Sequence, residues 1–292
     1  MKLTINELTK EYIKGVRALD GITMELTEGV YGLLGPNGAG KSTMMNILTD
    51  NLKATSGQVL YNDEPMDKLG KNYRKELGYM PQQQGLYAGF TLNRFLYYMA
   101  SLKGIKKNDA KKQIPELISL VNLSDVANKK LSSFSGGMKQ RALIAQALLG
   151  NPHIIILDEP TAGLDPKERV RIRNLVSEIS LNRIVIVATH VVSDIESIAK
   201  DVIMMKKGKL INMLPPEEFC DELVGEVYEF EVEPGALPDI YKKYIVTGVT
   251  NNQGMVRVRV VVNKEKSLQD WVSVTPTLED VYLKFFGDDW EL

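Results

Sequence analysis

Cysteine, histidine and tryptophan are scarce in this 292-residue sequence, which contains one cysteine and two residues each of histidine and tryptophan. Cys220 alone cannot form an internal disulfide, so the chain is not a disulfide-stapled scaffold, and we expect a reducing, cytosolic setting. Long apolar runs are also missing. The longest, such as Ile154–Leu157 and Ile184–Ala188, fall far short of the ~18–20 residues that a membrane-spanning helix requires. Residues 1–10 show no apolar signal-peptide core. If the protein acts at a membrane, we expect another chain to provide the spans.

Composition and charge indicate a globular protein with two oppositely charged regions. Apolar residues make up 44% of the chain and charged residues 25%, which excludes a disordered tail or a collagen-like fibre. Residues 1–220 contain 29 basic and 23 acidic residues, whereas residues 221–292 contain 7 basic and 14 acidic. The change coincides with Pro215-Pro216, a pair unsuited to the interior of a regular element. We therefore predict a large domain over 1–214, a linker over 215–222 and a small acidic accessory domain over 223–292. The acidic charge of residues 221–292 argues against nucleic acid as a partner of that region, and we expect none for the chain.

Strands and helices alternate through the first 213 residues. We predict buried strands at Val30–Leu34, Ile154–Leu157 and Arg183–Ala188, and helices at Ser42–Leu52, Lys167–Ser180 and Val192–Ala199. Bare apolar strands separated by helices are typical of an α/β fold with a mostly parallel core sheet that is covered on both faces.

Two other segments of the large domain have a different character. Residues 85–150 are mainly helical in pattern, as in Thr91–Leu102 and Lys111–Val121, and predict a helical subdomain inserted between strands. Alternating apolar residues within the first 27 predict a small N-terminal antiparallel β subdomain.

The tail reads as a small α+β domain. Val227–Val232 alternates apolar and acidic residues and predicts a half-exposed strand. A turn at 251–254 leads to a second alternating strand, Met255–Val262. Thr277 precedes an amphipathic helix that runs to Phe286 and stops at Gly287.

A phosphate-binding loop is the strongest motif in the sequence. The run Gly35-Pro36-Asn37-Gly38-Ala39-Gly40-Lys41-Ser42 matches GxxxxGK[ST], with a predicted strand before it and a predicted helix after it. Glycines let backbone N–H groups curl around phosphate oxygens, and the helix directs its positive N-terminus at the same charge. Lys41 would reach the β- and γ-phosphates and Ser42 would offer its hydroxyl to Mg²⁺.

Two carboxylates follow a buried strand. In Ile154-Ile155-Ile156-Leu157-Asp158-Glu159-Pro160, the acids stand at the carboxyl end of a parallel strand, where α/β proteins bind ligands. Asp158 would hold Mg²⁺ and Glu159 would orient and polarise an attacking water. Taken alone, the pair could also be a solvated strand end.

The run Leu131-Ser132-Ser133-Phe134-Ser135-Gly136-Gly137-Met138-Lys139-Gln140-Arg141 resembles the signature loop of ATP-binding-cassette (ABC) ATPases. The resemblance covers about residues 1–213, and the other motifs occur in the family's order. Gln82 matches the family's Q-loop, Gly163-Leu164-Asp165-Pro166 its D-loop, His190 its switch histidine and Tyr12 its adenine-stacking aromatic. Phe134 departs from the family's usual leucine, and we expect only a packing change there.

The resemblance implies ATP and Mg²⁺ as cofactors and assigns roles to these positions. Glu159, His190, Gln82 and Lys41 would be catalytic, and Ser42, Gln82 and Asp158 would be near the metal. The nucleotide-binding set is Tyr12, Gly35, Pro36, Asn37, Gly38, Ala39, Gly40, Lys41, Ser42, Thr43, Ser135, Gly136 and Gly137. Without the resemblance, Gln82 could be a surface loop amide, Tyr12 edge-strand packing and His190 a structural histidine. His153, the other histidine, receives no role.

The resemblance also implies partners. In this family the signature loop completes the site of a second subunit, so we expect a head-to-tail dimer, in the first instance a homodimer, with ATP between the copies. ATP hydrolysis would drive a separate integral-membrane permease, and binding to that permease would place the chain at the cytoplasmic face of the membrane. Segment 83–90 would dock that permease, with Leu86 and Tyr87 as contacts, although buried loop packing would explain the same residues.

Export is favoured over import by the tail. The run 275–283 resembles the C-terminal end of cassette proteins that are paired with separate exporter permeases, although its helix could simply pack on the tail's own sheet. The alternative function is a soluble ABC ATPase that acts without a permease, in cofactor assembly or regulation. A P-loop kinase or small GTPase is disfavoured by the loop at 135–141 and by Glu159.

Overall fold

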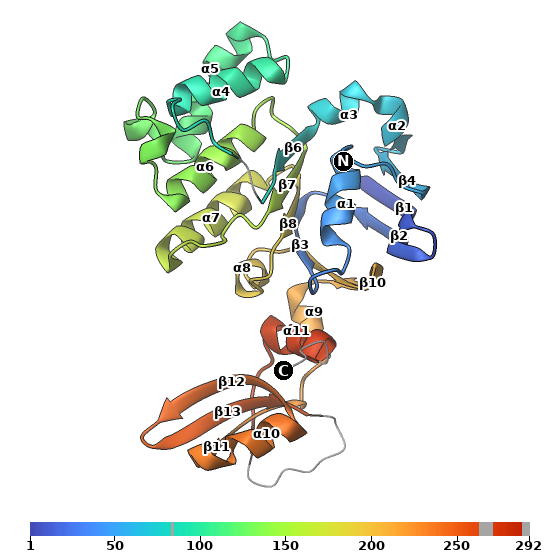
Figure 1. Ribbon diagram of the computed structural model, residues 1–292, viewed down its shortest axis with the longest axis vertical. Coiled ribbons are helices and arrows are strands. Elements are labelled where there is room, and N and C mark those ends of the chain that lie inside the picture. The colour runs from blue at the N-terminus through green and yellow to red at the C-terminus, as the bar shows by residue number, and fades with distance from the viewer. Residues whose placement is uncertain (83–84, 263–270, 288–292) are drawn as a thin grey trace. The chain divides into compact units, whose positions relative to one another are not determined.

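The computed structural model describes residues 1–82, 85–262 and 271–287, which form two compact units, Met1–Met213 and Leu214–Leu292 (Figure 1). Each unit has its own sheet and its own core. Where we predict a linker over 215–222, the structure has helix α9 (Pro216–Asp221) of the second unit. Pro216 occupies the first helical turn, a position that proline tolerates because its missing N–H has no partner there anyway.

The first unit begins with an antiparallel sheet, as predicted. Its strands are β1 (Leu3–Ile13), β2 (Val16–Leu26), β4 (Ser56–Tyr61) and β5 (Glu64–Pro65), in the order β2-β1-β4-β5. The sheet extends beyond the first 27 residues because β4, far along the chain, pairs with β1. Short helices α2 (Met66–Leu69) and α3 (Lys71–Lys75) follow it.

The core sheet of this unit has six strands in the order β10-β9-β3-β8-β7-β6. Their bounds are β3 Gly29–Leu34, β6 Leu77–Met80, β7 Ile154–Asp158, β8 Ile184–Ala188, β9 Asp201–Lys206 and β10 Lys209–Leu214. Strands β9, β3, β8, β7 and β6 pair in parallel, which confirms the predicted α/β fold with a mostly parallel sheet.

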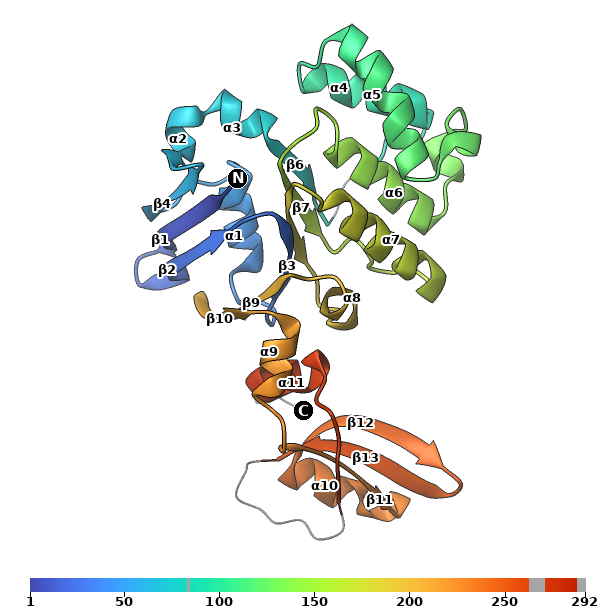
Figure 2. The same ribbon diagram turned by 180° about the vertical axis from the view of Figure 1, so that it is seen from behind.

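Helices cover both faces of the parallel sheet (Figures 1 and 2). Helix α1 (Lys41–Leu48) lies between the two sheets, and its buried methionine, isoleucine and leucine side chains share one core with β1, β2, β3, β7 and β8. The opposite face meets α6 (Gly136–Ala147), α7 (Pro166–Ile179) and α8 (Ser193–Glu196). Contact there is close, since a Cβ on Gly32 of β3 would collide with Ile195 of α8.

Two predicted helices are shorter than expected. The helix predicted over 42–52 ends at Leu48, because Asp50 takes a left-handed conformation and the next two N–H groups return to the carbonyl of Asn46. The helix predicted over 192–199 is the single turn α8. The N–H of Lys200 donates to the carbonyl of Val30, which draws the chain back into the sheet as β9.

The segment between β6 and β7 is helical, with α4 (Leu92–Leu102), α5 (Lys107–Leu120), α6 and two 3₁₀ turns (Ser124–Val126 and Leu131–Ser133). Helix α5 begins four residues before its predicted start, since its lysine-rich first turn carries little of the apolar periodicity on which the prediction relied. Phe134 is buried.

The second unit is an antiparallel sheet with helices. Its elements after α9 are β11 (Val227–Val232), α10 (Leu237–Lys243), β12 (Ile245–Asn252), β13 (Met255–Val261), β14 (Val272–Ser273) and α11 (Leu278–Phe286), with sheet order β12-β13-β11-β14. The predicted turn shrinks to Gln253-Gly254, both with positive φ, because residues 251–252 extend β12. Helix α11 carries the predicted Thr277 cap and packs on β12, β13 and α9 of its own unit.

Helices long and apolar enough to cross a bilayer are not found among the residues that the structure describes.

Candidate nucleotide-binding site

Four neighbouring parallel strands each end in one of the predicted site segments. The phosphate-binding loop follows β3, His190 follows β8, Glu159 follows β7 and Gln82 follows β6. Because β3, β8, β7 and β6 are adjacent and parallel, their carboxyl ends meet at one edge of the sheet. Segments separated by up to about 155 positions are thereby assembled at the edge where α/β sheets bind ligands.

The loop 35–42 has the shape of an anion cradle. It leaves β3 at Gly35 and enters α1 at Lys41, and Gly40 caps α1 in a left-handed conformation without any side-chain cap, so the first N–H groups of the helix face the loop. A side chain at Gly35 would collide with the carbonyl of Met205, and one at Gly40 would approach the carbonyl of Ala18 to 2.5 Å. Only glycine satisfies both positions.

Lys41 lies over this loop. Its ammonium donates to the carbonyl oxygen of Pro36 at 3.0 Å and to that of Gly35. Burial lowers the pKa of Lys41, while the carboxylates of Glu159 and Asp158 act to raise it. Burial likewise raises the pKa of Asp158, helped by the neighbouring Glu159 and opposed by a hydrogen bond from the Gln82 backbone and by Lys41. The site thus places one cation and two carboxylates in a partly desolvated environment.

Glu159 is held firmly by the end of β8. Its backbone N–H donates to Ala188, and its φ is +51°, which is uncommon for a residue with a side chain. Oε1 accepts from the His190 backbone at 3.1 Å and lies 2.8 Å from His190 Nδ1, while Oε2 accepts from the Thr189 hydroxyl at 3.3 Å. The carboxylate is therefore oriented from three directions and remains about one-tenth exposed.

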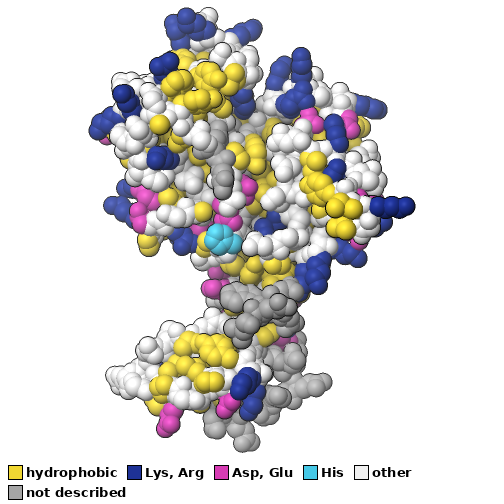
Figure 3. Space-filling view, viewed as in Figure 1, with side chains coloured by type: hydrophobic (Ala, Val, Ile, Leu, Met, Phe, Trp, Pro, Cys, Tyr) yellow, Lys and Arg dark blue, Asp and Glu magenta, His cyan; other side chains and the backbone are white. Residues whose placement is uncertain are grey.

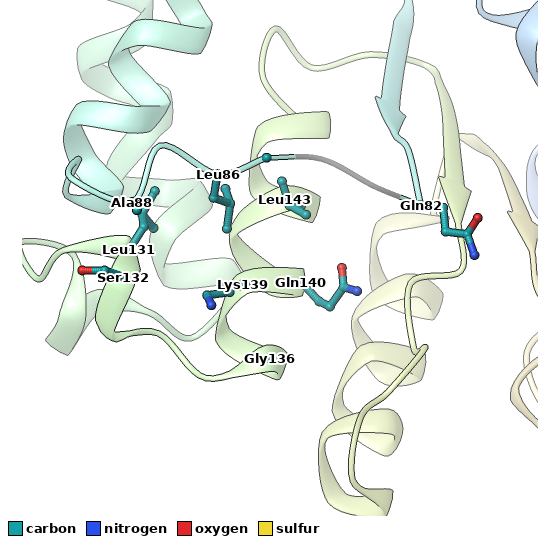
Figure 4. A pocket seen from close by; sticks show the side chains of 10 residues that line it. Gln82, Leu86, Ala88, Leu131, Ser132, Gly136, Lys139, Gln140 and Leu143 are labelled. Atoms are coloured by element: carbon teal, nitrogen blue, oxygen red, sulfur yellow. The ribbon is translucent and has the colours of Figure 1, made fainter.

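Gln82 and Tyr12 lie at the rim. The Gln82 backbone bonds Asp158, whereas its side chain is exposed and points away from Gln140 and Leu143 in Figure 4. Tyr12, near the end of β1, is 59% exposed, and its hydroxyl lies 3.4 Å from Oγ1 of Thr43 in the first turn of α1. An exposed aromatic face beside the phosphate-binding helix suits a nucleotide base.

The signature residues are placed elsewhere. Ser135 caps α6 and accepts from the N–H of Met138 at 3.3 Å, and Gly136 and Gly137 open the helix. Among the described residues, no hydrogen bond links this loop to the phosphate-binding loop. It lies against α7 and the loop before that helix: a Cβ on Gly136 would lie 3.5 Å from Leu164 of the loop, and one on Gly137 would collide with Glu168 of α7.

A hollow of about 660 Å³ lies beside the signature helix (Figure 4). It is lined by residues of the segment after Gln82 and of α6, including Leu86, Ala88, Gln140 and Leu143. Of the predicted docking segment 83–90, Gln83 and Gln84 lie outside the described residues. Tyr87 is 46% exposed, and its ring stacks on Phe90 at 5.1 Å and meets Tyr98 edge-on at 5.3 Å.

The donor set fits Mg²⁺ bound together with phosphates. Among the described residues, no group of three His, Cys, Asp or Glu side chains could hold a metal by itself. Asp158, the Ser42 hydroxyl and the cradle provide hard oxygen ligands and anion-binding N–H groups, and Mg²⁺ is commonly bound by one or two protein oxygens plus substrate phosphates.

Three residues that support the site or the signature helix are not predicted from the sequence. They are Thr189, whose hydroxyl bonds Glu159, Glu168, which lies against Gly137, and Asp194, which pairs with Arg169. Thr189 stands next to a predicted residue, and that adjacency was its only signal.

Comparison with known proteins identifies the family. The ABC transporter family profile matches residues 19–162. The chain is 32% identical to the uncharacterized ABC transporter ATP-binding protein YxlF of Bacillus subtilis, with 97% of this chain and 98% of that protein aligned. It is 30% identical to the Nod factor export ATP-binding protein I of Rhizobium sp. strain N33, over 94% and 93% of the two chains.

Solved structures of ABC cassettes support the same family assignment. CbiO1 of Clostridium perfringens, part of the ABC transporter complex cbiONQ, is 30% identical with a TM-score of 0.69 over 75% of this chain and 90% of its own. The dimeric post-hydrolysis structure of the cassette MJ0796, bound to ADP and Pi, is 29% identical with a TM-score of 0.63 over 73% and 98%. A parallel sheet that gathers these motifs at one edge, and relatives 30% and 32% identical over more than nine-tenths of both chains, show that the chain belongs to the ABC transporter ATP-binding proteins.

Proposed function

We propose that the chain hydrolyses Mg·ATP between two copies of itself and thereby drives export through a separate permease. The observation that carries the ATPase is the convergence of the loop 35–42, Asp158, Glu159, His190 and Gln82 at the ends of four adjacent strands. Each side chain there has the chemistry that phosphoryl transfer to water requires.

The phosphates would lie in the cradle 35–42, with Lys41 leaving its carbonyl partners to meet their oxygens and Tyr12 stacking on the base. Thr43 and Ser42, in the first turn of α1, would bond phosphate oxygens and the ion's shell, and Asp158 and Gln82 would complete that shell. Mg²⁺, when bound, supplies positive charge that offsets the phosphate oxygens. Glu159 would orient the attacking water and accept its proton, because its carboxylate is fixed by its contacts with Thr189 and His190 and is largely buried.

A second copy would complete the site. Ser135, Gly136 and Gly137 form a helix N-terminus with glycine backbone, a ready anion site, but they bond no part of their own phosphate loop among the described residues. A head-to-tail pairing gives them a γ-phosphate to bind, that of the partner. The dimer of the related MJ0796 cassette supports this arrangement.

A permease is the partner that the surface of α4 suits. Tyr97, Tyr98 and Leu102 of α4 are exposed, as is Tyr87 in the loop before it. Figure 3 shows apolar side chains gathered on the face over α4 and α5. Next to them lies the hollow lined by Leu86 and Leu143. An apolar face beside a hollow fits a short helix of a membrane protein, which would hold the chain at the inner face of the membrane. Export is supported by the name of the related Nod factor export protein.

The test of the ATPase and of the dimer uses Glu159→Gln. A glutamine has nearly the same shape as glutamate but cannot accept a proton from the water, so turnover should fall by at least about 100-fold. Light scattering should show that Mg·ATP converts monomers of this variant to dimers. Wild-type protein with Mg·ADP, which should stay monomeric, is the control. Turnover at the parental rate would remove Glu159 from its role, and a monomeric Glu159→Gln variant with Mg·ATP would refute the ATP-bridged dimer.

The test of the permease uses Leu86→Asp, at a half-buried position, and Tyr87→Asp, at an exposed one. Leu181→Asp is the control because Leu181 is exposed, as Tyr87 is, but lies in the turn before β8. We expect both variants to lose co-purification with a multi-span membrane protein from detergent-solubilised membranes and the control to retain it, while ATP binding persists in all three. Absence of any such partner for the wild-type chain would favour the soluble ABC ATPase.

A further inference from the structure

Helix α7 contacts both the signature helix and the segment after His190, which act on different ATP molecules in the proposed dimer. Its N-cap is Asp165, whose side chain accepts from the N–H of Glu168 at 3.0 Å. Two consecutive residues in its first turns, Glu168 and Arg169, then reach different parts of the molecule.

Glu168 reaches the signature helix. Its carboxylate lies so close to Gly137 that any side chain there would collide with it. Oε2 lies 3.7 Å from Nη2 of Arg141, is buried and has no hydrogen-bond partner, while Oε1 accepts from Arg171. Nε of Arg141 is also buried without a partner. The buried Arg141 and the partly buried Glu168 therefore face each other without a short hydrogen bond between them, which leaves the pair able to tighten when α6 shifts.

Arg169 reaches the segment that carries the switch histidine. Its Nη2 donates to Oδ2 of Asp194 at 3.1 Å, and Asp194 is 5% exposed. One turn further along α7, Arg173 donates to the carbonyl of Ser193 at 3.1 Å. Asp194 stands four residues after His190, which itself holds Glu159. The ion pair between half-buried Arg169 and buried Asp194 thus fixes the chain that positions His190, because a buried carboxylate cannot leave its partner without a large penalty.

We propose that α7 couples the two ATP sites of the dimer, an inference that rests on the proposed function. In a head-to-tail pair the signature residues 135–137 contact the partner's ATP, whereas His190 and Glu159 act on the chain's own ATP. Binding at the first site presses Gly137 and Arg141 toward Glu168. The rigid helix passes that displacement to Arg169, Asp194 and the His190 segment, because packed interfaces shift between discrete arrangements and do not deform continuously. Glu168 and Arg169 are positioning residues of this relay.

The test compares Glu168→Gln and Arg169→Gln with Lys167→Gln, an exposed neighbour in the same turn for which no ion pair is seen among the described residues. ATPase rate is measured against Mg·ATP concentration. We expect a Hill coefficient between 1 and 2 for the wild type and for Lys167→Gln, and one near 1 for the other two variants. Because both act in one relay, the double variant should lose no more cooperativity than either single variant.

Two further measurements distinguish a loss of coupling between the ATP sites from a loss of ATP binding or of folding. Affinity of the monomer for Mg·ATP should stay within about twofold in all variants, since neither residue touches the cradle. Amide hydrogen exchange over residues 190–200 should slow on ATP-driven dimerisation in the wild type and should slow less in Glu168→Gln. If Glu168→Gln does not fold, Arg169→Gln carries the same expectation from the other end.

Failure of this inference is distinct from failure of the proposed function. A Glu159→Gln variant that stays monomeric with Mg·ATP refutes the dimer itself. If that variant dimerises, a wild-type Hill coefficient of 1, cooperativity that survives in both Glu168→Gln and Arg169→Gln, or a cooperativity loss accompanied by a fall in monomer affinity overturns the coupling alone.

Discussion

The backbone N–H of His190 and its ring nitrogen Nδ1 both contact the same oxygen of Glu159, Oε1, at 3.1 and 2.8 Å. The other oxygen of that carboxylate accepts from the hydroxyl of Thr189, which is 1% exposed and also accepts from the N–H of Val191 at 3.0 Å. The tight turn after β8 therefore determines where the carboxylate points. Glu159 sits on strained backbone with positive φ, so its position depends on these three contacts.

Removal of the Thr189 hydroxyl should slow catalysis without weakening binding. Thr189→Val keeps the shape but loses a hydrogen bond to a charged group, worth about 1.5 kcal/mol, so we expect kcat to fall about 10-fold with KM little changed. Thr189→Ser retains the hydroxyl and should remain near the parental rate. Steady-state kinetics at saturating Mg·ATP measure both, and equal rates for the valine and serine variants would contradict the role.

Loss of the Tyr12 ring should weaken ATP binding. Base stacking on an aromatic side chain is worth about 1–3 kcal/mol, so Tyr12→Ala should raise the Kd for Mg·ATP by about 10-fold or more. Tyr12→Phe keeps the ring and loses only the exposed 3.4 Å contact with Thr43, and should bind almost as tightly. Calorimetry measures both. Inorganic tripolyphosphate, which has no base, should bind all three proteins alike, and an equal loss for it would place Tyr12 in phosphate binding.

The sequence predicted the site where chemistry and chain order coincide. A glycine-rich loop, an acidic strand end and a histidine after an apolar run each follow a strand, and parallel strands bring such ends together. The strands Val227–Val232 and Ile184–Ala188 were predictable for a similar reason, since period and apolar content are local properties.

Other features depend on contacts that local patterns do not encode. Strand β4 exists as part of the antiparallel sheet because β1, more than 50 residues earlier, pairs with it. The bond between Thr189 and Glu159 spans 30 residues, and the contact between Gly137 and Glu168 joins two helices. Proline at 216 looks like a break in the sequence, yet it begins α9, since a first helical turn requires no N–H from that residue.

Lys103 should make folding stability depend on pH in the alkaline range. Its ammonium donates to the carbonyls of Leu149 at 2.7 Å and Leu77 at 3.2 Å, and burial lowers its pKa from 10.5 to about 8. Between those values the unfolded chain holds a proton that the folded chain has released, so the free energy of unfolding rises with pH, by at most about 3 kcal/mol. The stability cost of the buried charge is present below about pH 8.

Urea unfolding at pH 7.5 and 10 measures this effect as the difference between the wild type and Lys103→Met, which cancels the titration of other groups. We expect the wild type to gain stability relative to Lys103→Met as pH rises. Exposed Lys106→Met should behave as the wild type does. A constant difference between the wild type and Lys103→Met across this range would mean that Lys103 titrates as an ordinary surface lysine.

Asp280 should anchor the second unit. Burial acts to raise the pKa of Asp280, but hydrogen bonds from Arg259 and Thr277 outweigh it and lower the pKa. Oδ2 accepts from Nη2 of Arg259 at 2.7 Å and from the N–H of Thr277 at 2.8 Å, so one carboxylate caps α11 and ties it to β13. Asp280→Asn removes one of the two carboxylates that pair with Arg259, while Glu229 remains 3.1 Å from Nη1 of that arginine. We therefore expect a loss of about 2 kcal/mol, the size of a hydrogen bond to a charged group.

Differential scanning calorimetry of the full chain tests this, because Asp280→Asn should lower the transition of the second unit and leave that of the first in place. Glu279→Gln, an exposed neighbour in the same turn, should change neither. The lowered pKa of Asp280 also makes stability depend on pH. The ionised carboxylate stabilises the fold fully above its pKa in the unfolded chain, about 3.8, and this stabilisation is lost as pH falls through the lower pKa of the folded chain. The stability difference between the wild type and Asp280→Asn should therefore shrink below about pH 4, and a difference that stays constant down to pH 3 would show that shape, and not charge, holds α11 to the sheet.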